Sequence, residues 1–152
     1  MPDTLSALPK GYKFPAARFD LSREWVDEYV EAVGDAAISE LHADSSPPQV
    51  RLTSLTPGQG DIVPPMALAA LSVRALLESA GLPPGSIHLS QEVAFLRAVR
   101  TGEKLAALAE VVSRGERQGW VLMGIDMRVS DAAGAPVMTG RAMLTFPLEG
   151  EA

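Results

Sequence analysis

The sequence contains no cysteine among its 152 residues. Without a thiol, the chain can form no disulfide, thiolate zinc site, iron–sulfur cluster or cysteine nucleophile. Its two histidines, His42 and His88, lie too far apart in the sequence for the usual spacing of zinc ligands. No Gly-x-Ser-x-Gly motif marks a serine hydrolase elbow either. We therefore predict no metal site and no cofactor.

Long apolar runs and an excess of positive charge are also missing. No run approaches the roughly 18 apolar residues of a membrane span, and the N-terminus lacks the pattern of a secretory signal. The net charge of −6 and the pI of about 4.9 disfavour nucleic acid, because that affinity depends on Lys and Arg displacing counterions. We expect a cytoplasmic protein that binds neither membrane nor nucleic acid.

The composition that remains is typical of one folded domain. Hydrophobic residues make up 47% of the chain and charged residues 21%, which excludes wholesale disorder. Residues 1–15 carry three prolines and no sustained periodicity, so we expect a loosely attached N-terminal arm. Residues 16–148 are then a single domain.

The first half of that domain predicts one strand, one helix and a long loop. A strand is expected at residues 17–21, followed by a helix that Ser22 caps and Gly34 ends, with Val26, Tyr29 and Val30 on its apolar face. Residues 35–61 read as a loop with a short strand at residues 50–55. Loops of this length are usually functional.

The segment at residues 62–80 predicts the most distinctive element, a helix that is apolar nearly all round. Pro64 and Pro65 suit a first helical turn, and Gly81 stands where a left-handed cap would end the helix. A helix with apolar residues on every side is expected to be buried on every side.

The last seventy residues change to a period of two, which is typical of strands. Residues 120–130 alternate cleanly, with Val121, Met123 and Ile125 on one face, and residues 137–146 return as a second strand after the turn at residues 131–134. Two further strands are expected at residues 88–99 and 104–113, around the turn at residues 100–103. The predicted fold class is α+β, with an antiparallel sheet curled around a long apolar helix, a hot-dog arrangement.

Two segments of the sequence resemble the MaoC-like hydratases and dehydratases, especially the N-terminal type of MaoC-like domain. Residues 29–35 (Tyr-Val-Glu-Ala-Val-Gly-Asp) look like the family's helix that ends in Gly-Asp, and residues 95–105 look like its strand-turn-strand signature. The resemblance spans most of the chain. It implies an (R)-specific enoyl-CoA hydratase or hydroxyacyl dehydratase of fatty acid metabolism, a lyase whose ligand is an acyl-CoA or acyl-carrier thioester.

The resemblance also implies an acid/base pair, and here the sequence departs from the family motif. The Gly-Asp of the motif stands at Gly34-Asp35, the Asn-Pro is absent, and Glu40 occupies the histidine position, with His42 two residues later. If the protein is active, Asp35 and His42 are the candidate pair. The alternative interpretation makes Asp35 a loop acid and His42 a solvated side chain.

A second departure concerns the oxyanion hole, which the family forms at the N-terminus of its buried helix. The corresponding residues here are Pro65, Met66 and Ala67, and proline has no N–H to donate. Losing one such donor typically costs about 10²–10³ in turnover.

Three cations, Arg97, Arg100 and Lys104, are candidates to bind the phosphates of coenzyme A or an acidic carrier protein. A solvated turn explains them equally well, and His88 is expected at an edge or interface rather than in the site. An unprotected sheet edge predicts a homodimer or a heterodimer with another hot-dog subunit.

Two alternatives to an active hydratase stay open. One is a non-catalytic subunit or acyl-binding module that pairs with an active partner. The other, ranked last, is an acyl-CoA thioesterase, because Glu78 is the one acid of the apolar helix and lies near its C-terminal end.

Overall fold

The computed structural model describes residues 4–33 and 62–148. In chain order the elements are η1 (Leu5–Ala7), β1 (Ala17–Asp20), α1 (Arg23–Val33), α3 (Pro65–Ser79), β2 (Ile87–Phe95), β3 (Lys104–Arg117), β4 (Trp120–Asp131) and β5 (Pro136–Pro147). The Gly34 helix end, Asp35, His42 and the short strand predicted at residues 50–55 lie outside the described residues. No helix in the described part of the chain is long and apolar enough to cross a bilayer.

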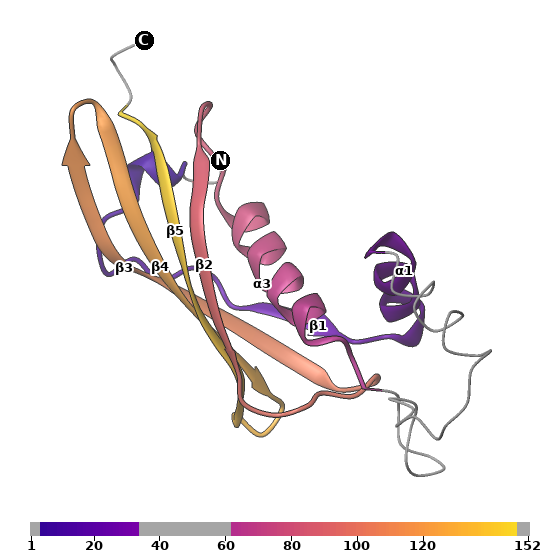
Figure 1. The fold of residues 1–152 in the computed structure, drawn as a ribbon. Helices are drawn as coiled ribbons and strands as arrows, with labels where there is room; N and C mark the ends of the chain where they lie inside the picture. The colour runs from indigo at the N-terminus through magenta and orange to yellow at the C-terminus, as the bar shows by residue number, and fades with distance from the viewer. Residues whose placement is uncertain (1–3, 34–61, 149–152) are drawn as a thin grey trace, which may run out of the picture.

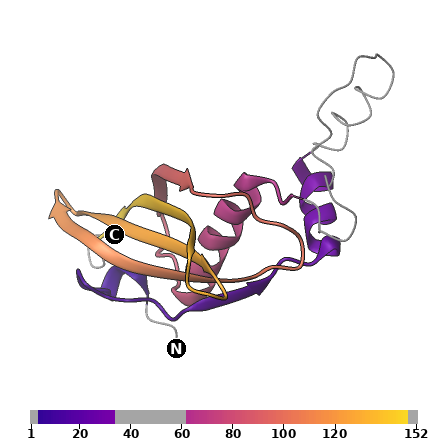
Figure 2. The same cartoon turned by 90° about the horizontal axis from the view of Figure 1, so that it is seen from below.

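The sheet has five strands in the order β1-β3-β4-β5-β2, and every neighbouring pair is antiparallel. Long α3 lies along one face of this curved sheet (Figures 1 and 2). This is the predicted α+β hot-dog fold. The strands β2 and β3 follow each other in sequence, yet they lie on opposite sides of the β4–β5 hairpin.

The alternation of β4 builds the core, as predicted. Val121, Met123, Ile125, Met127 and Val129 are all buried, facing α3. The turn into β5 also follows the sequence prediction, because Gly134 adopts a φ of 84° and the Asp131 carboxylate accepts the Ala133 and Ala135 N–H groups at 3.0 and 2.9 Å. The first residues of β3, 104–109, have a composition that favours a helix. They form a strand because β1 and β4 pair with β3 on either side.

The helix α1 begins as its cap predicts. The Ser22 hydroxyl accepts the Trp25 N–H at 3.2 Å, and Val26 is buried against the core. Trp25 stacks on Tyr29, with ring centroids 5.8 Å apart.

Two expectations for α3 are wrong. The helix is buried on one side only: Ala67 is fully buried, whereas Met66 is 56% exposed and Leu77 37% exposed, because the sheet covers a single face of the helix. Gly81 is not among the glycines with positive φ. Its carbonyl instead accepts the Leu5 N–H at 3.0 Å, so contact with the N-terminal segment sets the path of the chain after α3.

The N-terminal arm is not loosely attached over its described residues. Leu5, Leu8 and Phe14 are buried in the same core cluster as β4 and β5. The Gly11 N–H donates to the Val111 carbonyl at 2.7 Å, and the Phe14 N–H donates to the Ala109 carbonyl at 3.0 Å. The arm runs along β3 and closes one end of the helix–sheet interface.

Candidate functional site

The exposed apolar side of α3 forms one wall of an open groove, which we call the α3 groove. It encloses about 680 Å³, within the usual range for small-molecule sites. Ten residues from α1, α3 and β2 line it: Tyr29, Met66, Ala69, Ala70, Val73, Arg74, Leu77, Glu78, His88 and Gln91. Its lining is mostly apolar, as expected of a site for a hydrocarbon chain.

The groove follows α3 from its first turn almost to its last. Met66 stands at one end and Leu77 at the other, eleven residues apart, so this wall is about 16 Å long at the usual helical rise. At the far end, the Arg74 guanidinium binds Glu78 at 2.7 Å. That contact and the Coulombic attraction to Glu78 raise the pKa of Arg74. Among the described residues of the lining, these two opposite charges therefore compensate each other.

The opposite wall is the inner face of β2, and a β-bulge decides which residues face the groove. The register places His88 opposite Leu144 and Gln91 opposite Ala142, both of which are buried, with an irregularity between His88 and Ser90. Because the bulge inserts one extra residue, His88 and Gln91 point to the same side although they are three positions apart.

The first turn of α3 offers fewer N–H donors than an ordinary helix start. Pro64 is the N-cap and Pro65 the first helical residue. The Ala67 N–H already donates to the Pro64 carbonyl at 2.9 Å, and Ala67 is fully buried. Of the three predicted oxyanion residues, only Met66 presents an N–H that finds no acceptor within the described part of the chain.

The three predicted phosphate-binding cations lie at this same end of the molecule. The Val63 N–H donates to the Val99 carbonyl at 2.8 Å, and Ile62 forms a β-bridge with Arg100. These contacts hold the turn that carries Arg97, Arg100 and Lys104 against the segment leading into α3.

The charge of Arg97 is matched by two carboxylates. Its guanidinium contacts Glu103 at 2.8 Å and Asp131 at 2.9 Å, and donates to the Ala98 carbonyl at 2.8 Å. These hydrogen bonds raise the pKa of Arg97 and lower the pKa of Glu103 and of Asp131. Glu103 also accepts the Arg100 backbone N–H at 2.8 Å. A phosphate would have to compete with two carboxylates for Arg97.

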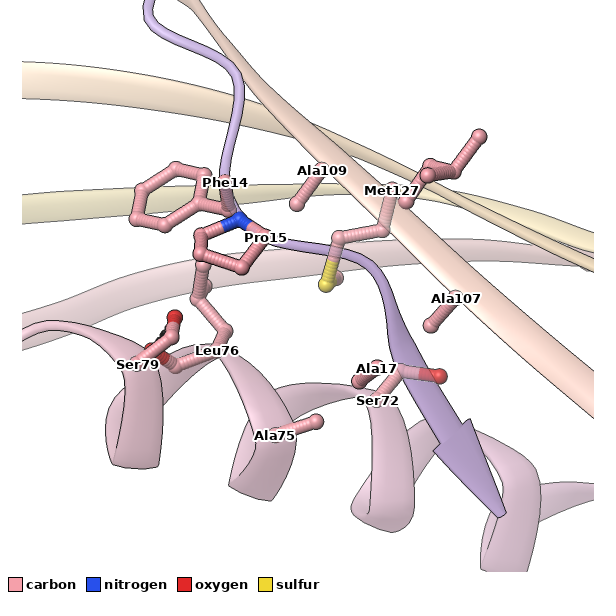
Figure 3. Close-up of a pocket in the computed structure, with 11 residues that line it drawn as sticks. Phe14, Pro15, Ala17, Ser72, Ala75, Leu76, Ser79, Ala107, Ala109 and Met127 are labelled. Carbon is pink, nitrogen blue, oxygen red and sulfur yellow. Dashed lines mark hydrogen bonds between the residues drawn. The ribbon is translucent and has the colours of Figure 1, made fainter.

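A second, much smaller hollow lies on the other side of α3, between the helix, the arm and β3 (Figure 3). Its volume of about 20 Å³ is enough for roughly one water molecule. The Ser72 and Ser79 hydroxyls on its wall already donate to the Leu68 and Leu76 carbonyls at 2.8 Å each. This hollow is too small for a ligand, so the α3 groove is the candidate site.

Several residues that line the α3 groove lie in elements that the sequence predicted. Met66 and Tyr29 were in predicted elements, and His88 was expected at an edge or interface and not in the site; Gln91 was missed. A strict period of two puts His88 and Gln91 on opposite faces of the strand, and only the bulge brings them together. The predicted acid/base pair, Asp35 and His42, lies outside the described residues and stays a prediction.

A scan against protein-family models matches residues 9–140 to the model described as the FAS1-like dehydratase domain region. No curated protein matches the sequence at a significant level.

Solved structures with similar folds span nearly the whole chain. The (R)-hydratase from A. caviae involved in PHA biosynthesis has a TM-score of 0.65 and 23% identity, covering 93% of this chain and 98% of that one. The MaoC-like dehydratase from Rhodospirillum rubrum has a TM-score of 0.67 and 18% identity, covering 95% and 96%. The HadBC (3R-hydroxyacyl-ACP dehydratase) complex from Mycobacterium tuberculosis has a TM-score of 0.64 and 19% identity, covering 93% and 100%.

Proposed function

We propose a function in thioester chemistry for this chain, which belongs to the FAS1-like dehydratase domain family of MaoC-like hot-dog proteins. In this proposal the chain binds an acyl-CoA or acyl-carrier thioester and acts on it as an enoyl hydratase or 3-hydroxyacyl dehydratase. The observation that carries the proposal is the α3 groove. It is apolar, about the size of a small-molecule site, and begins at the first turn of a helix.

In this proposal the acyl chain lies along α3 and the thioester lies near Met66. Hydration of an enoyl thioester adds water across the C2–C3 double bond: the oxygen bonds to C3, and a proton is delivered to C2. Negative charge develops on the thioester oxygen, where the Met66 N–H and the positive end of the helix stabilise it. Asp35 and His42 are the proposed acid/base pair that moves the protons.

The nucleotide end of a coenzyme A thioester is proposed to lie over the turn at residues 100–104. Arg97, Arg100 and Lys104 are the proposed contacts for its phosphates, and at Arg97 a phosphate would compete with Glu103 and Asp131. The position supports this assignment, because the turn adjoins the segment that enters α3.

A specific observation favours the second candidate function, a non-catalytic subunit that binds acyl thioesters. Pro65 has no N–H, and the Ala67 N–H is taken by the Pro64 carbonyl. The α3 groove can still bind a thioester, but a helix N-terminus with one remaining N–H donor stabilises the enolate oxygen poorly. A thioesterase is the weakest alternative, because Glu78 lies at the far end of the groove and is paired with Arg74.

A second hot-dog subunit, identical or related, is the proposed protein partner. The edge strand β2 is largely exposed and carries Ile87 and Leu89, each about half exposed at 51% and 52%. Exposed edge strands invite pairing with another chain. Pairing there would also bring partner residues toward the α3 groove, which β2 lines.

The proposed activity is tested by hydration of a short trans-2-enoyl-CoA, followed as loss of enoyl absorbance. Asp35→Ala and His42→Ala are compared with Asp27→Ala, an exposed acid on α1. Turnover that only the first two substitutions abolish supports the hydratase. Binding without turnover supports the non-catalytic subunit, and failure to bind any acyl thioester contradicts both.

A further inference from the structure

Among the described residues that line the α3 groove, Gln91 is the one with buried side-chain polar atoms that have no hydrogen-bond partner. Its amide nitrogen and amide oxygen are both buried, and neither has a hydrogen-bond partner among the residues that the structure describes. Buried polar groups in folded proteins are nearly always paired, so an amide with both ends unpaired calls for an explanation.

The backbone around Gln91 makes room for this side chain. Gln91 lies on the inner face of β2, and the neighbouring strand β5 presents Gly140 beside it. A Cβ built on Gly140 would lie 3.5 Å from the Gln91 amide nitrogen and 2.7 Å from the Glu92 carbonyl oxygen. The Gln91 amide thus lies in ordinary contact distance of this position, next to the Val93 side chain, whose Cγ1 would be 3.2 Å from the added Cβ.

The other polar groups that line the groove form no hydrogen bond with the Gln91 amide. Arg74 and Glu78 bind each other at the far end. Neither Tyr29 nor His88 forms a hydrogen bond with the Gln91 amide. The residues of α3 along the middle are Ala69, Ala70 and Val73. Turning the amide from its present position into the groove breaks no hydrogen bond with any described residue. A ligand with a hydrogen-bond acceptor and a donor in suitable positions would therefore favour the Gln91 amide turned into the groove.

The chemistry of a primary amide restricts which ligand that is. Its oxygen accepts and its nitrogen donates from adjacent positions, so a ligand that satisfies both must hold an acceptor and a donor side by side. A saturated or enoyl thioester has an acceptor carbonyl but no donor near it. A secondary amide, such as those in the pantetheine arm, is trans and points its N–H and C=O in opposite directions.

A 3-hydroxyacyl thioester does carry both groups close together. Its C1 carbonyl accepts a hydrogen bond, and its hydroxyl, two carbons away, donates one. We propose that Gln91 is a specificity-determining residue that selects the 3-hydroxyacyl form of the ligand. Its amide N–H donates a hydrogen bond to the thioester carbonyl, and its amide oxygen accepts a hydrogen bond from the 3-hydroxyl. This inference rests on the proposed function, and it assigns a role that neither the acid/base pair nor the helix start supplies.

The expected consequence is discrimination by a single hydroxyl. A site built to hydrogen-bond a ligand hydroxyl rejects the analogue that lacks it, because the polar group of the protein is then left unpaired. We expect the protein to bind a 3-hydroxyacyl thioester about fivefold more tightly than the saturated thioester of equal chain length, the change that one net hydrogen bond typically produces.

The test is a calorimetric titration of the full chain with (R)-3-hydroxyhexanoyl-CoA and hexanoyl-CoA. Asp35→Ala serves as the background, so that the hydroxyacyl ligand is not dehydrated during the titration. Gln91→Leu is the test variant, and Gln91→Met keeps an unbranched side chain in case leucine packs poorly. Ser90→Ala, next to Gln91 but on the outer face of β2, is the matched control.

We expect both Gln91 substitutions to bring the affinity ratio of the two ligands close to one, by weakening hydroxyhexanoyl-CoA more than hexanoyl-CoA, which can use only the donor of the amide. The control should keep the ratio. Equal binding of the two ligands by the unsubstituted Gln91 protein, or an unchanged ratio in the Gln91 variants, overturns this inference while leaving the proposed function intact. If neither thioester binds to any form of the protein, the proposed function itself fails.

Discussion

At the scale of single residues, Arg97 shows how a side chain suited to bind a ligand serves the fold. It joins the turn after β2 to the turn between β4 and β5 through Glu103 and Asp131, and these turns support the entrance to α3. The side chains are only partly exposed, at 37%, 29% and 20%. Planar guanidinium groups hold carboxylates in this way more specifically than lysine does.

This network predicts a pH-dependent contribution of Arg97 to stability. Because Arg97 lowers the pKa of Glu103 and of Asp131, its contribution is present above the ordinary carboxyl pKa and is lost as pH falls through the lowered values. Arg97→Met should therefore lower the urea midpoint of unfolding at pH 7, and the difference from wild type should shrink toward pH 3.

The control is Arg128→Met, which removes the same charge from an exposed position on β4. It should change the urea midpoint little at either pH. A difference between Arg97→Met and wild type that stays constant from pH 7 to pH 3 would contradict the role of the two carboxylates.

At the scale of elements, the pairing of β2 with β5 shapes the α3 groove. This pairing depends on close approach at Gly140, where a Cβ would meet the Glu92 backbone oxygen at 2.7 Å. A backbone atom in a sheet cannot turn away as a flexible side chain can. The wall that carries His88 and Gln91 therefore needs glycine at this position.

We predict that Gly140→Ala destabilises the protein by about 1–3 kcal/mol, the usual cost of overpacking, and weakens thioester binding. The matched control is Gly115→Ala on β3, where a Cβ would have nothing within 4 Å. Chemical unfolding and ligand titration measure the two effects. Equal behaviour of the two variants would show that the close approach does not constrain β2.

At the scale of the whole molecule, the N-terminal arm completes the core. Leu5 is fully buried in the core, and its N–H donates a hydrogen bond to the carbonyl of Gly81, just after α3. The Arg114 guanidinium also donates to the Ser6 carbonyl at 3.0 Å. The arm thereby joins the C-terminal end of α3 to β3.

Leu5→Ala should destabilise the protein by about 2–5 kcal/mol, as other buried leucine truncations do. Lys10→Ala, an exposed position in the same arm, should cost little. Guanidinium unfolding followed by tryptophan fluorescence measures both. Similar midpoints for the two variants would mean that the arm is loosely attached after all.

The proposed pairing through β2 makes a second prediction at this scale. The protein should be a dimer at micromolar concentration by light scattering, and Leu89→Lys should shift it toward monomer, since charge on an edge strand blocks edge pairing. The control is Leu108→Lys, equally exposed at 53% but on β3 inside the sheet. A monomeric wild type would refute the pairing.

The local patterns of the sequence determined much of this fold. The alternation of β4, the Ser22 cap and the Asp131–Gly134 turn act within a few residues of one another, so their structures follow from backbone geometry and side-chain period. The start of β3 is different, because its composition favours a helix and its pairing with β1 and β4 makes it a strand. The order of these elements was enough to predict the α+β hot-dog fold.

The tertiary structure alone decided the site. The apolar character of α3 does not tell which side of it the sheet covers, and the open side is the groove. A bulge in β2 turns His88 and Gln91 to one face, and bulges depend on the partner strand. The arm is held by contacts with residues about a hundred positions away, such as Val111 and Arg114. Period and propensity are local properties, whereas burial and register are set by long-range contacts that the sequence pattern does not encode.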